Sequence, residues 1–332
     1  MKPSVLNHRG KKRSTKRMVL AAAASALSVT IASSAAAADQ SGELRFPSVI
    51  TLPNDAIAGD LGYQPEGIAV RGATAYVGSF ADGTVVTADL RTGQSRVLVE
   101  ADGDPALGVE VTDRFVLVAG ALSGEIRVYD RRSGHELAVY KVTDRGLVND
   151  ITVIAGTAYF TDSQRAVLYR LPLDRAELEA PTEIPLAGDF KLASPGPGVF
   201  NSNGIVAQDG HTVIVAQTTS PDGAGSALYA VDVATGHATR INITGGAIRG
   251  ADGLVLKGNM LSVVQYDANS IAQLRLSTNG SEAEYRGTVT NDSVAVPTTA
   301  DYGPGGALYN VNSRFGTLPS DSVSYEIVRI GR

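Results

Sequence analysis

The sequence EGIAVRGATAYVGS at residues 66–79 shows the pattern on which the whole chain is built. It consists of a polar residue, an alternating strand, a tight turn and a second strand. Five further segments repeat this order, and successive first residues lie 41, 42, 54, 49 and 46 positions apart. A period of about 40–50 residues is typical of repeat architectures in which each repeat is one supersecondary unit. The six segments begin at Glu66, Leu107, Asn149, Asn203, Asp252 and Thr298.

Each repeat has room for four strands. After the first five hairpins a third alternating strand and a hairpin turn follow, as in GTVVTADLRTGQSRVLV at residues 83–99. Strands of period two that are rich in Thr, Val, Ile and Tyr, with Gly-rich turns and no helical period, indicate radially repeated sheets. We therefore predict an all-β fold, a six-bladed β-propeller of four-stranded blades, in one domain over residues 39–332.

The last repeat lacks one strand. Only VSYEIVRIGR, at residues 323–332, follows its hairpin. The alternating segment from Gly42 to Leu52 can supply the missing outer strand. Pairing of the N-terminal segment with the last blade would close the ring and cover a sheet edge.

The N-terminus has the features of an export signal. A basic stretch ends at Arg17, an apolar run extends from Met18 through Ile31, and small residues follow up to Ala38. This order predicts a Sec-type signal peptide over residues 1–38, with cleavage near Ala38. A membrane anchor is the alternative, but the run is rich in Ala and Ser and marginal in length for a span of roughly 20 apolar residues. We expect a secreted protein that has no membrane association after the signal is removed.

Charge and composition exclude several classes of function. Residues 1–38 contain seven basic and no acidic residues, so the rest of the chain has 22 basic and 34 acidic residues, a formal charge of −12. A chain this acidic should repel nucleic acid, so we expect no nucleic-acid partner. The absence of Cys excludes disulfides, thiolate metal sites and cysteine nucleophiles. No GxSxG motif is present to indicate a serine hydrolase.

A carboxylate or carboxamide residue begins four of the six repeats at one structural position, just before the innermost strand. In a propeller, Glu66, Asn149, Asn203 and Asp252 would surround the central channel at one end. Two carboxylates and two carboxamides facing one channel would repel or compete unless they bind something, and hard divalent cations take oxygen ligands of this kind. The alternative is that Asn-Asp, Asn-Gly and Asp-Gly are ordinary turns, although Glu is a poor turn residue. We predict one divalent metal ion, calcium first, with magnesium, manganese or zinc as alternatives.

Two further features bear on the mouth of the channel. Since paired strands are antiparallel, the residues that end the second strands return to the same mouth as candidate substrate-binding residues. The third repeat also carries a long excursion, from Leu173 to Phe200, which is either a rim loop over the mouth or a mobile connection. The strand-end candidates are Ser79, Asp162, Gln217 and Gln265.

The order of these motifs resembles the senescence-marker-protein/gluconolactonase/regucalcin family of six-bladed lactone hydrolases, over most of residues 60–332. The resemblance implies that Glu66, Asn203 and Asp252 bind a divalent metal and that Asn149 contacts substrate. The family often has an Arg two residues before the third-blade Asn, whereas Leu147 stands there in this chain. The aromatic residue that commonly follows the family's Glu is also missing. The resemblance is therefore to a distant, secreted branch.

Together these observations predict a secreted, divalent-metal-dependent hydrolase of a lactone or cyclic ester. We expect a monomer that acts on a small molecule. Asp252 would position or deprotonate a water molecule, and Asn149 would orient the substrate carbonyl. The alternative is a non-catalytic extracellular propeller that binds a ligand or protein around a structural metal. A third hypothesis is another reaction on the same scaffold, as in strictosidine-synthase-like proteins, since propellers host many functions.

Overall fold

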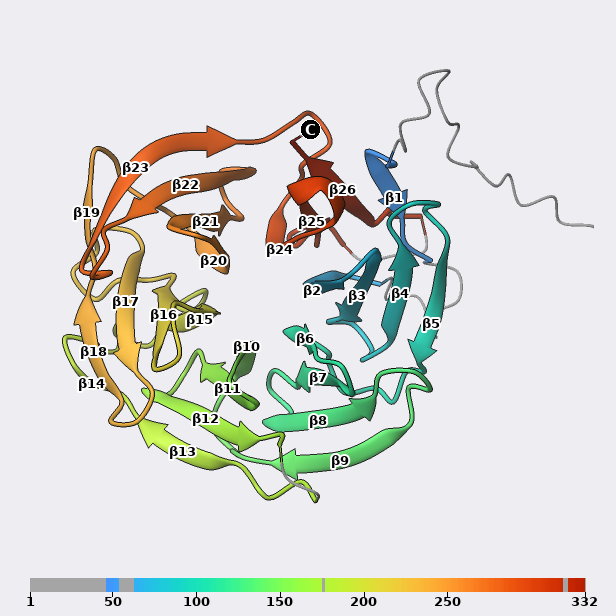
Figure 1. The fold of residues 1–332 in the computed structure, drawn as a ribbon, viewed down its shortest axis with the longest axis horizontal. Helices are drawn as coiled ribbons and strands as arrows, with labels where there is room; N and C mark the ends of the chain where they lie inside the picture. The colour runs from blue at the N-terminus through green and yellow to red at the C-terminus, as the bar shows by residue number, and fades with distance from the viewer. Residues whose placement is uncertain (1–45, 54–62, 175–176, 319–321, 332) are drawn as a thin grey trace, which may run out of the picture. The chain divides into compact units, whose positions relative to one another are not determined.

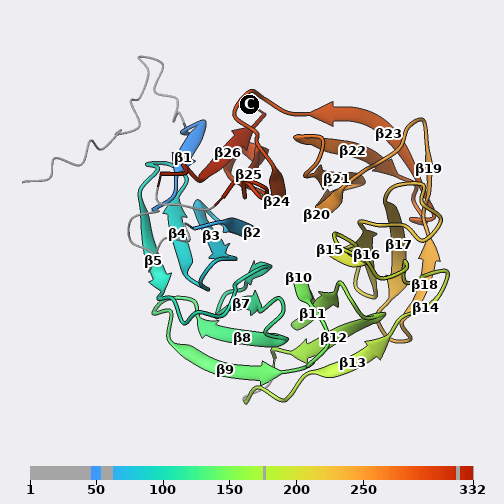
Figure 2. The same ribbon diagram turned by 180° about the vertical axis from the view of Figure 1, so that it is seen from behind.

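Six sheets form a ring in this computed structural model, which describes residues 46–53, 63–174, 177–318 and 322–331 (Figures 1 and 2). Each blade contains four antiparallel strands, and the fourth and fifth blades each gain a short parallel strand at the edge. The predicted six-bladed propeller is therefore confirmed. The predicted signal peptide and the predicted start of the domain at residue 39 lie outside the described residues.

In each blade the strands are given from the central channel of the ring outward. Blade one contains β2 (Pro65–Arg71), β3 (Thr74–Ser79), β4 (Val85–Asp89) and β5 (Ser95–Val99). Blade two contains β6 (Val109–Val111), β7 (Phe115–Ala119), β8 (Glu125–Asp130) and β9 (Glu136–Lys141). Blade three contains β10 (Val148–Ile154), β11 (Thr157–Asp162), β12 (Val167–Pro172) and β13 (Thr182–Pro185).

The later blades use the same order. Blade four contains β15 (Ser202–Ala207), β16 (Thr212–Gln217), β17 (Ala227–Asp232) and β18 (His237–Arg240), with β14 (Ala187–Gly188) at its edge. Blade five contains β20 (Ala251–Lys257), β21 (Met260–Gln265), β22 (Ser270–Leu276) and β23 (Glu282–Val289), with β19 (Asn242–Thr244) at its edge. Blade six contains β24 (Pro297–Tyr302), β25 (Leu308–Asn312), β26 (Glu326–Ile330) and β1 (Val49–Thr51).

The hydrophobic core lies between neighbouring blades. Phe115 and Leu117 of blade two, for example, belong to one buried cluster with Phe160 and Tyr169 of blade three. Because each blade buries its faces against the next, no blade has a core of its own and the repeats fold as one unit. Within the described residues no helix could span a membrane, and the one helical turn there is η1 (Pro304–Gly306).

An N-terminal segment forms the outer strand of blade six. β1 pairs antiparallel with β26, with Ile50 opposite Ile327. Ile50 and Leu52 are each 2% exposed and share a core cluster with Val77 of blade one. Of the strand predicted from Gly42 to Leu52, residues 42–45 lie outside the described part of the chain.

A β-bulge opens the innermost strand in five blades. In blade one the register moves three residues on β2, from Pro65 to Ile68, while β3 moves two residues, from Ser79 to Val77. A bulge turns a side chain out of the regular pleat and is common beside functional sites. The equivalent register shifts lie between Val148 and Ile151, Ser202 and Ile205, Ala251 and Leu254, and Pro297 and Ala300.

Candidate functional site

The bulges bring four predicted site residues to one cavity of about 520 Å³. Glu66, Asn149, Asn203 and Asp252 line it, and their exposed fractions are 4%, 4%, 5% and 7%. Each is the residue directly after the first paired position of its inner strand, so the repeat places all four at the same level of the channel. The structure therefore assembles two carboxylates and two carboxamides in one enclosed place.

A glycine follows Glu66, Asn203 and Asp252, and these glycines are needed for close packing of the blades. A Cβ atom at Gly204 would overlap the backbone oxygen of Asp252, and one at Gly253 would overlap the backbone of Thr299. Neither glycine adopts the left-handed conformation that turn glycines require. The turn explanation that the sequence left open therefore does not account for Asn203-Gly204 or Asp252-Gly253.

The side-chain amide of Asn149 has a fixed orientation. Ser163 Oγ donates its one hydrogen to the backbone oxygen of Ser202 at 2.6 Å. It must therefore accept from Asn149, whose Nδ2 lies 2.8 Å away. This arrangement leaves Asn149 Oδ1 buried and without a hydrogen-bond partner.

Asn203 repeats this arrangement one blade later. Thr218 Oγ1 donates to the backbone oxygen of Ala251 at 2.6 Å and accepts from Asn203 Nδ2 at 3.0 Å. Asn203 Oδ1 is likewise buried and unpaired. Two buried amide oxygens without partners in one cavity are unusual, because buried acceptors are normally hydrogen-bonded. A bound group with positive charge or a donor hydrogen would satisfy them.

The surroundings of Glu66 and Asp252 disfavour the charged forms of both carboxyl groups. Burial raises the pKa of Glu66 well above its usual value, and the charges of Asp252 and Asp150 raise it further. Burial also raises the pKa of Asp252, and so does the charge of Asp150, while a hydrogen bond from Asn203 opposes the shift. None of the described residues that line the cavity is a Lys, Arg or His that could neutralise these groups.

The donor set fits a hard divalent cation. No group of three or more His, Cys, Asp or Glu side chains in the described residues is arranged to hold a metal. A cation in this cavity would consequently need the amide oxygens of Asn149 and Asn203 besides the carboxylates of Glu66 and Asp252. An all-oxygen set of this kind suits calcium, magnesium or manganese and is poor for zinc, which prefers nitrogen and sulfur ligands in proteins.

The strand-end residues predicted to line the mouth do not reach the cavity, because their side chains are used inside the blades. Asp162 Oδ1 accepts from the backbone nitrogens of Leu147 and Gln164, and its Oδ2 accepts from Tyr169. Ser79 donates to the backbone of Tyr63, Gln217 contacts Asn201 and Tyr229, and Gln265 contacts Arg249 and Ser270.

After two of these strand ends, the next residue along the chain reaches the cavity instead. Phe80 and Tyr266, which follow Ser79 and Gln265, line the cavity. Ser163 and Thr218 follow the other two strand ends and orient the two Asn amides. Successive residues of a strand point to opposite faces, so an error of one position exchanges the buried face for the cavity face.

The remaining two repeat-start residues have different roles. Leu107 lines the cavity with an apolar side chain. Thr298 is fully buried, and its Oγ1 donates to the backbone oxygen of Glu66 at 2.7 Å. Thr298 therefore supports the bulge that carries Glu66.

The long excursion of the third repeat reaches the mouth. Gly196, Gly198, Val199 and Phe200, at its end, line the same cavity. The rim-loop explanation thus describes this end of the segment, while β13 and β14 extend the outer edges of blades three and four.

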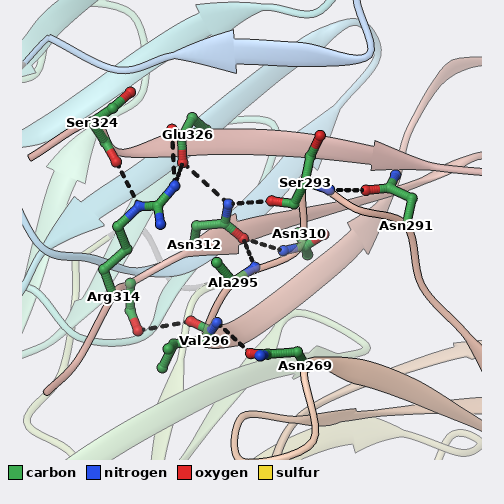
Figure 3. Close-up of polar contacts among 11 residues, drawn as sticks. Asn269, Asn291, Ser293, Ala295, Val296, Asn310, Asn312, Arg314, Ser324 and Glu326 are labelled. Atoms are coloured by element: carbon green, nitrogen blue, oxygen red, sulfur yellow. Dashed lines mark hydrogen bonds and ion pairs between the residues drawn. The ribbon is translucent and has the colours of Figure 1, made fainter. Parts of the chain in front are cut away.

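Figure 3 shows a polar network in blade six that includes Arg314 and Glu326. Arg314 donates to both carboxylate oxygens of Glu326, at 3.1 and 2.9 Å, and Glu326 also accepts from Asn312. Arg314 has a φ of 54°, a conformation that a non-glycine residue keeps only when its surroundings fix it. The next residue, Phe315, lines the cavity and meets the ring of Phe80 edge-on, with ring centroids 5.5 Å apart.

Known structures share this architecture. No protein-family model and no curated protein matches the sequence. The Malassezia sympodialis allergen Mala s 1 superposes with a TM-score of 0.63 at 16% identity, over 86% of this chain and 97% of the other. A gluconolactonase from Xanthomonas campestris gives 0.55 at 16% identity over 86% and 99% of the two chains. A calcium-binding regucalcin from Agrobacterium tumefaciens gives 0.55 at 16% identity over 86% and 96%.

This chain has a gluconolactonase-like propeller fold. At these identities the likeness establishes the fold, and the chemistry has to be argued from the cavity itself.

Proposed function

We propose that this protein is a divalent-metal-dependent hydrolase of a lactone or related cyclic ester. One observation carries the proposal: the amide oxygens of Asn149 and Asn203 are buried, unpaired and oriented by neighbouring hydroxyls, in a cavity that also holds Glu66 and Asp252. The gluconolactonase and the calcium-binding regucalcin among the structures that share the fold support it.

These residues have two roles, to hold a cation and to accept a proton. When bound, a divalent cation polarises an ester carbonyl and lowers the pKa of water. Glu66, Asn203 and Asp252 would hold it. Asp252 is also the proposed base, because its carboxylate would lie beside the water that the cation activates.

Asn149 can act in two ways in this proposal. We predicted that it orients the substrate carbonyl, which requires a donor. Its Nδ2 donates one of its two hydrogens to Ser163, so the second remains for a carbonyl oxygen, and its buried Oδ1 is an acceptor without a partner. Asn149 therefore suits the cation through Oδ1 and the substrate carbonyl through Nδ2.

Water is the nucleophile in this proposal. The described residues that line the cavity include no Ser, Cys, Lys or His. A covalent intermediate on one of these side chains is therefore not part of the mechanism, and hydrolysis depends on activation of water beside Asp252.

Metal analysis and a lactone panel test the proposal together. We expect the purified protein to bind calcium, to melt at a lower temperature after chelation and to hydrolyse lactones only in the metal-loaded form. Glu66→Gln and Asp252→Asn should lose metal affinity and turnover. Asp301→Asn is the matched control, because it makes the same change in a channel carboxyl that lines a different cavity. Metal binding without any turnover would instead favour the binding-protein alternative, and unchanged metal content in both variants would refute the metal site.

We also propose that the protein acts outside the cytoplasm, because residues 1–38 have the basic, apolar and small-residue regions of a signal peptide. Mass spectrometry of protein from the culture medium should find an N-terminus at or near Asp39. Full-length protein that stays in the membrane fraction would contradict this proposal.

A further inference from the structure

The walls above the oxygen ligands are apolar. Besides the four polar ring residues, the only polar side chains that line the cavity in the described part of the chain are Gln164 and Tyr266. Leu147 stands two residues before Asn149 and adds an alkyl side chain close to the ring. The apolar lining includes Phe80, Leu122, Leu147, Val199, Phe200 and Phe315.

The apolar side chains of this wall pack against one another. Leu107 and Leu147 are buried in one cluster, and Phe80 and Phe200 pack against it while remaining partly exposed. Phe80 and Phe315 are fixed to each other by their edge-on contact. Three phenylalanines, from blade one, the segment before blade four and the segment after β25, therefore present preorganised apolar surface to the cavity.

The apolar side chains that line this cavity favour an apolar ligand. Leu122 is 66% exposed at the rim although it lines the cavity, which makes it one of the few large apolar side chains left in water among the described residues. Water gains free energy by leaving such a wall when an apolar group covers it. A polyhydroxylated ring would find few donors or acceptors there for its hydroxyl groups, and burying them unpaired is unfavourable.

We infer that the substrate is a lactone that carries an apolar substituent, an alkyl chain or an aromatic ring, and not a sugar lactone. This inference rests on the proposed function. The ester group lies at Glu66, Asn203 and Asp252, and the substituent lies against Phe80, Phe200 and Phe315. The volume of about 520 Å³ falls within the roughly 300–1,000 Å³ of small-molecule sites and accommodates a ring with a medium-length chain.

A homologous series of six-membered lactones tests the inference. With calcium-saturated protein, kcat/KM should rise about fourfold per buried methylene from δ-valerolactone through δ-octalactone to δ-decalactone. D-glucono-δ-lactone, which has the same ring size, should be at least about 100-fold poorer than δ-decalactone. A flat series, or a preference for the glucono-lactone, would overturn the inference and leave the hydrolase proposal standing.

Variants of the wall assign the effect to the cavity. Leu122→Ser should reduce the ratio of kcat/KM between δ-decalactone and δ-valerolactone several-fold. Because Leu122 is exposed, this substitution should not destabilise the fold. Leu137→Ser is the control, because Leu137 is a similarly exposed leucine, 47%, on the outer strand β9. An equal effect of both variants would contradict the assignment.

A binding assay separates the two proposals if no lactone is turned over. The chain has no Trp, so the fluorescence of N-phenyl-1-naphthylamine, a neutral apolar probe, can be followed without indole background. We expect the probe to bind, to be displaced by δ-decalactone and not by D-glucono-δ-lactone, and to bind several-fold more weakly to Leu122→Ser. That result without hydrolysis would support the apolar site and refute the hydrolase. Absence of probe binding would refute the apolar site.

Discussion

Asn203 Nδ2 lies 3.0 Å from Thr218 Oγ1, and this single contact decides which end of the amide faces the cavity. The hydroxyl hydrogen of Thr218 is already donated to the backbone oxygen of Ala251. Asn203 therefore directs its Nδ2 to Thr218, and its Oδ1 is buried without a hydrogen-bond partner. Ser163 and Asn149 form the same pair in blade three, so the site depends on two hydroxyl groups that would not themselves touch the metal.

The first prediction removes one of these hydroxyl groups. Thr218→Val keeps the shape of the side chain but lets the Asn203 amide rotate, so calcium affinity should fall about 10–100-fold, the usual effect of losing a residue that orients a ligand. Calorimetric titration with calcium measures it. Thr87→Val is the control, because Thr87 is also a buried threonine but lies on β4 and does not line the cavity. Equal calcium affinity in wild type and Thr218→Val would show that Asn203 Oδ1 is not a ligand.

The second prediction concerns the Arg314–Glu326 pair of blade six. Glu326→Gln removes the charge that holds Arg314 in its positive-φ conformation, so the free energy of unfolding should fall by about 1–3 kcal/mol. The neighbouring Phe315 should lose its fixed position, and binding of the apolar probe should weaken. Glu284→Gln breaks the exposed Arg286–Glu284 pair and should cost less than about 0.5 kcal/mol. Equal losses of stability in urea unfolding of the two variants would contradict this prediction.

The fold could be predicted because its signal is repeated. The six repeated hairpins fix the number of blades. Their alignment alone places Glu66, Asn149, Asn203 and Asp252 at one level of the channel. The β-bulges turn these side chains into the channel. They lie at the same place in each repeat that contains a bulge, so the alignment of the repeats also gives their positions.

The parts of the site that depend on strand ends and distant partners could not be predicted. Whether Ser79 or Phe80 faces the cavity depends on one position in the register, and the alternating pattern does not show where the pleat stops. The orientation of each Asn amide depends on a hydroxyl 14 or 15 residues further along the chain. Phe200 and Phe315 reach the cavity from irregular segments, which carry no periodic pattern.

The third prediction concerns the N-terminal strand of blade six. Ile50 is 2% exposed in the core cluster, so Ile50→Ala should lower the free energy of unfolding by about 2–4 kcal/mol. Val49 lies on the same strand but is 38% exposed, so Val49→Ala should change the free energy of unfolding by less than about 0.5 kcal/mol. Urea unfolding of both variants measures the difference. Parental stability of Ile50→Ala would show that β1 adds nothing to the ring.

The last prediction concerns the carboxyl groups further along the channel. Glu110, Asp150 and Asp301 line a second cavity of about 150 Å³. Burial, followed by the charges of Asp301 and Asp150, raises the pKa of Glu110 to about 8, although Arg71 opposes the shift. Burial likewise raises the pKa of Asp301 to about 6.

The sign of the pH dependence follows from these shifts. Between the ordinary pKa of a Glu and about 8, the folded state keeps a proton on Glu110 that the unfolded state has lost. The contribution of Glu110 to stability is therefore largest at acidic pH and falls as the pH rises towards 8, by at most ~1.4 kcal/mol per pH unit. Glu110→Gln cannot lose the proton, so its stability should decline less between pH 5 and pH 8.5. Urea unfolding at the two pH values, with chelator present to exclude metal effects, measures the difference, and an identical decline in wild type and variant would show that Glu110 titrates normally in the folded protein.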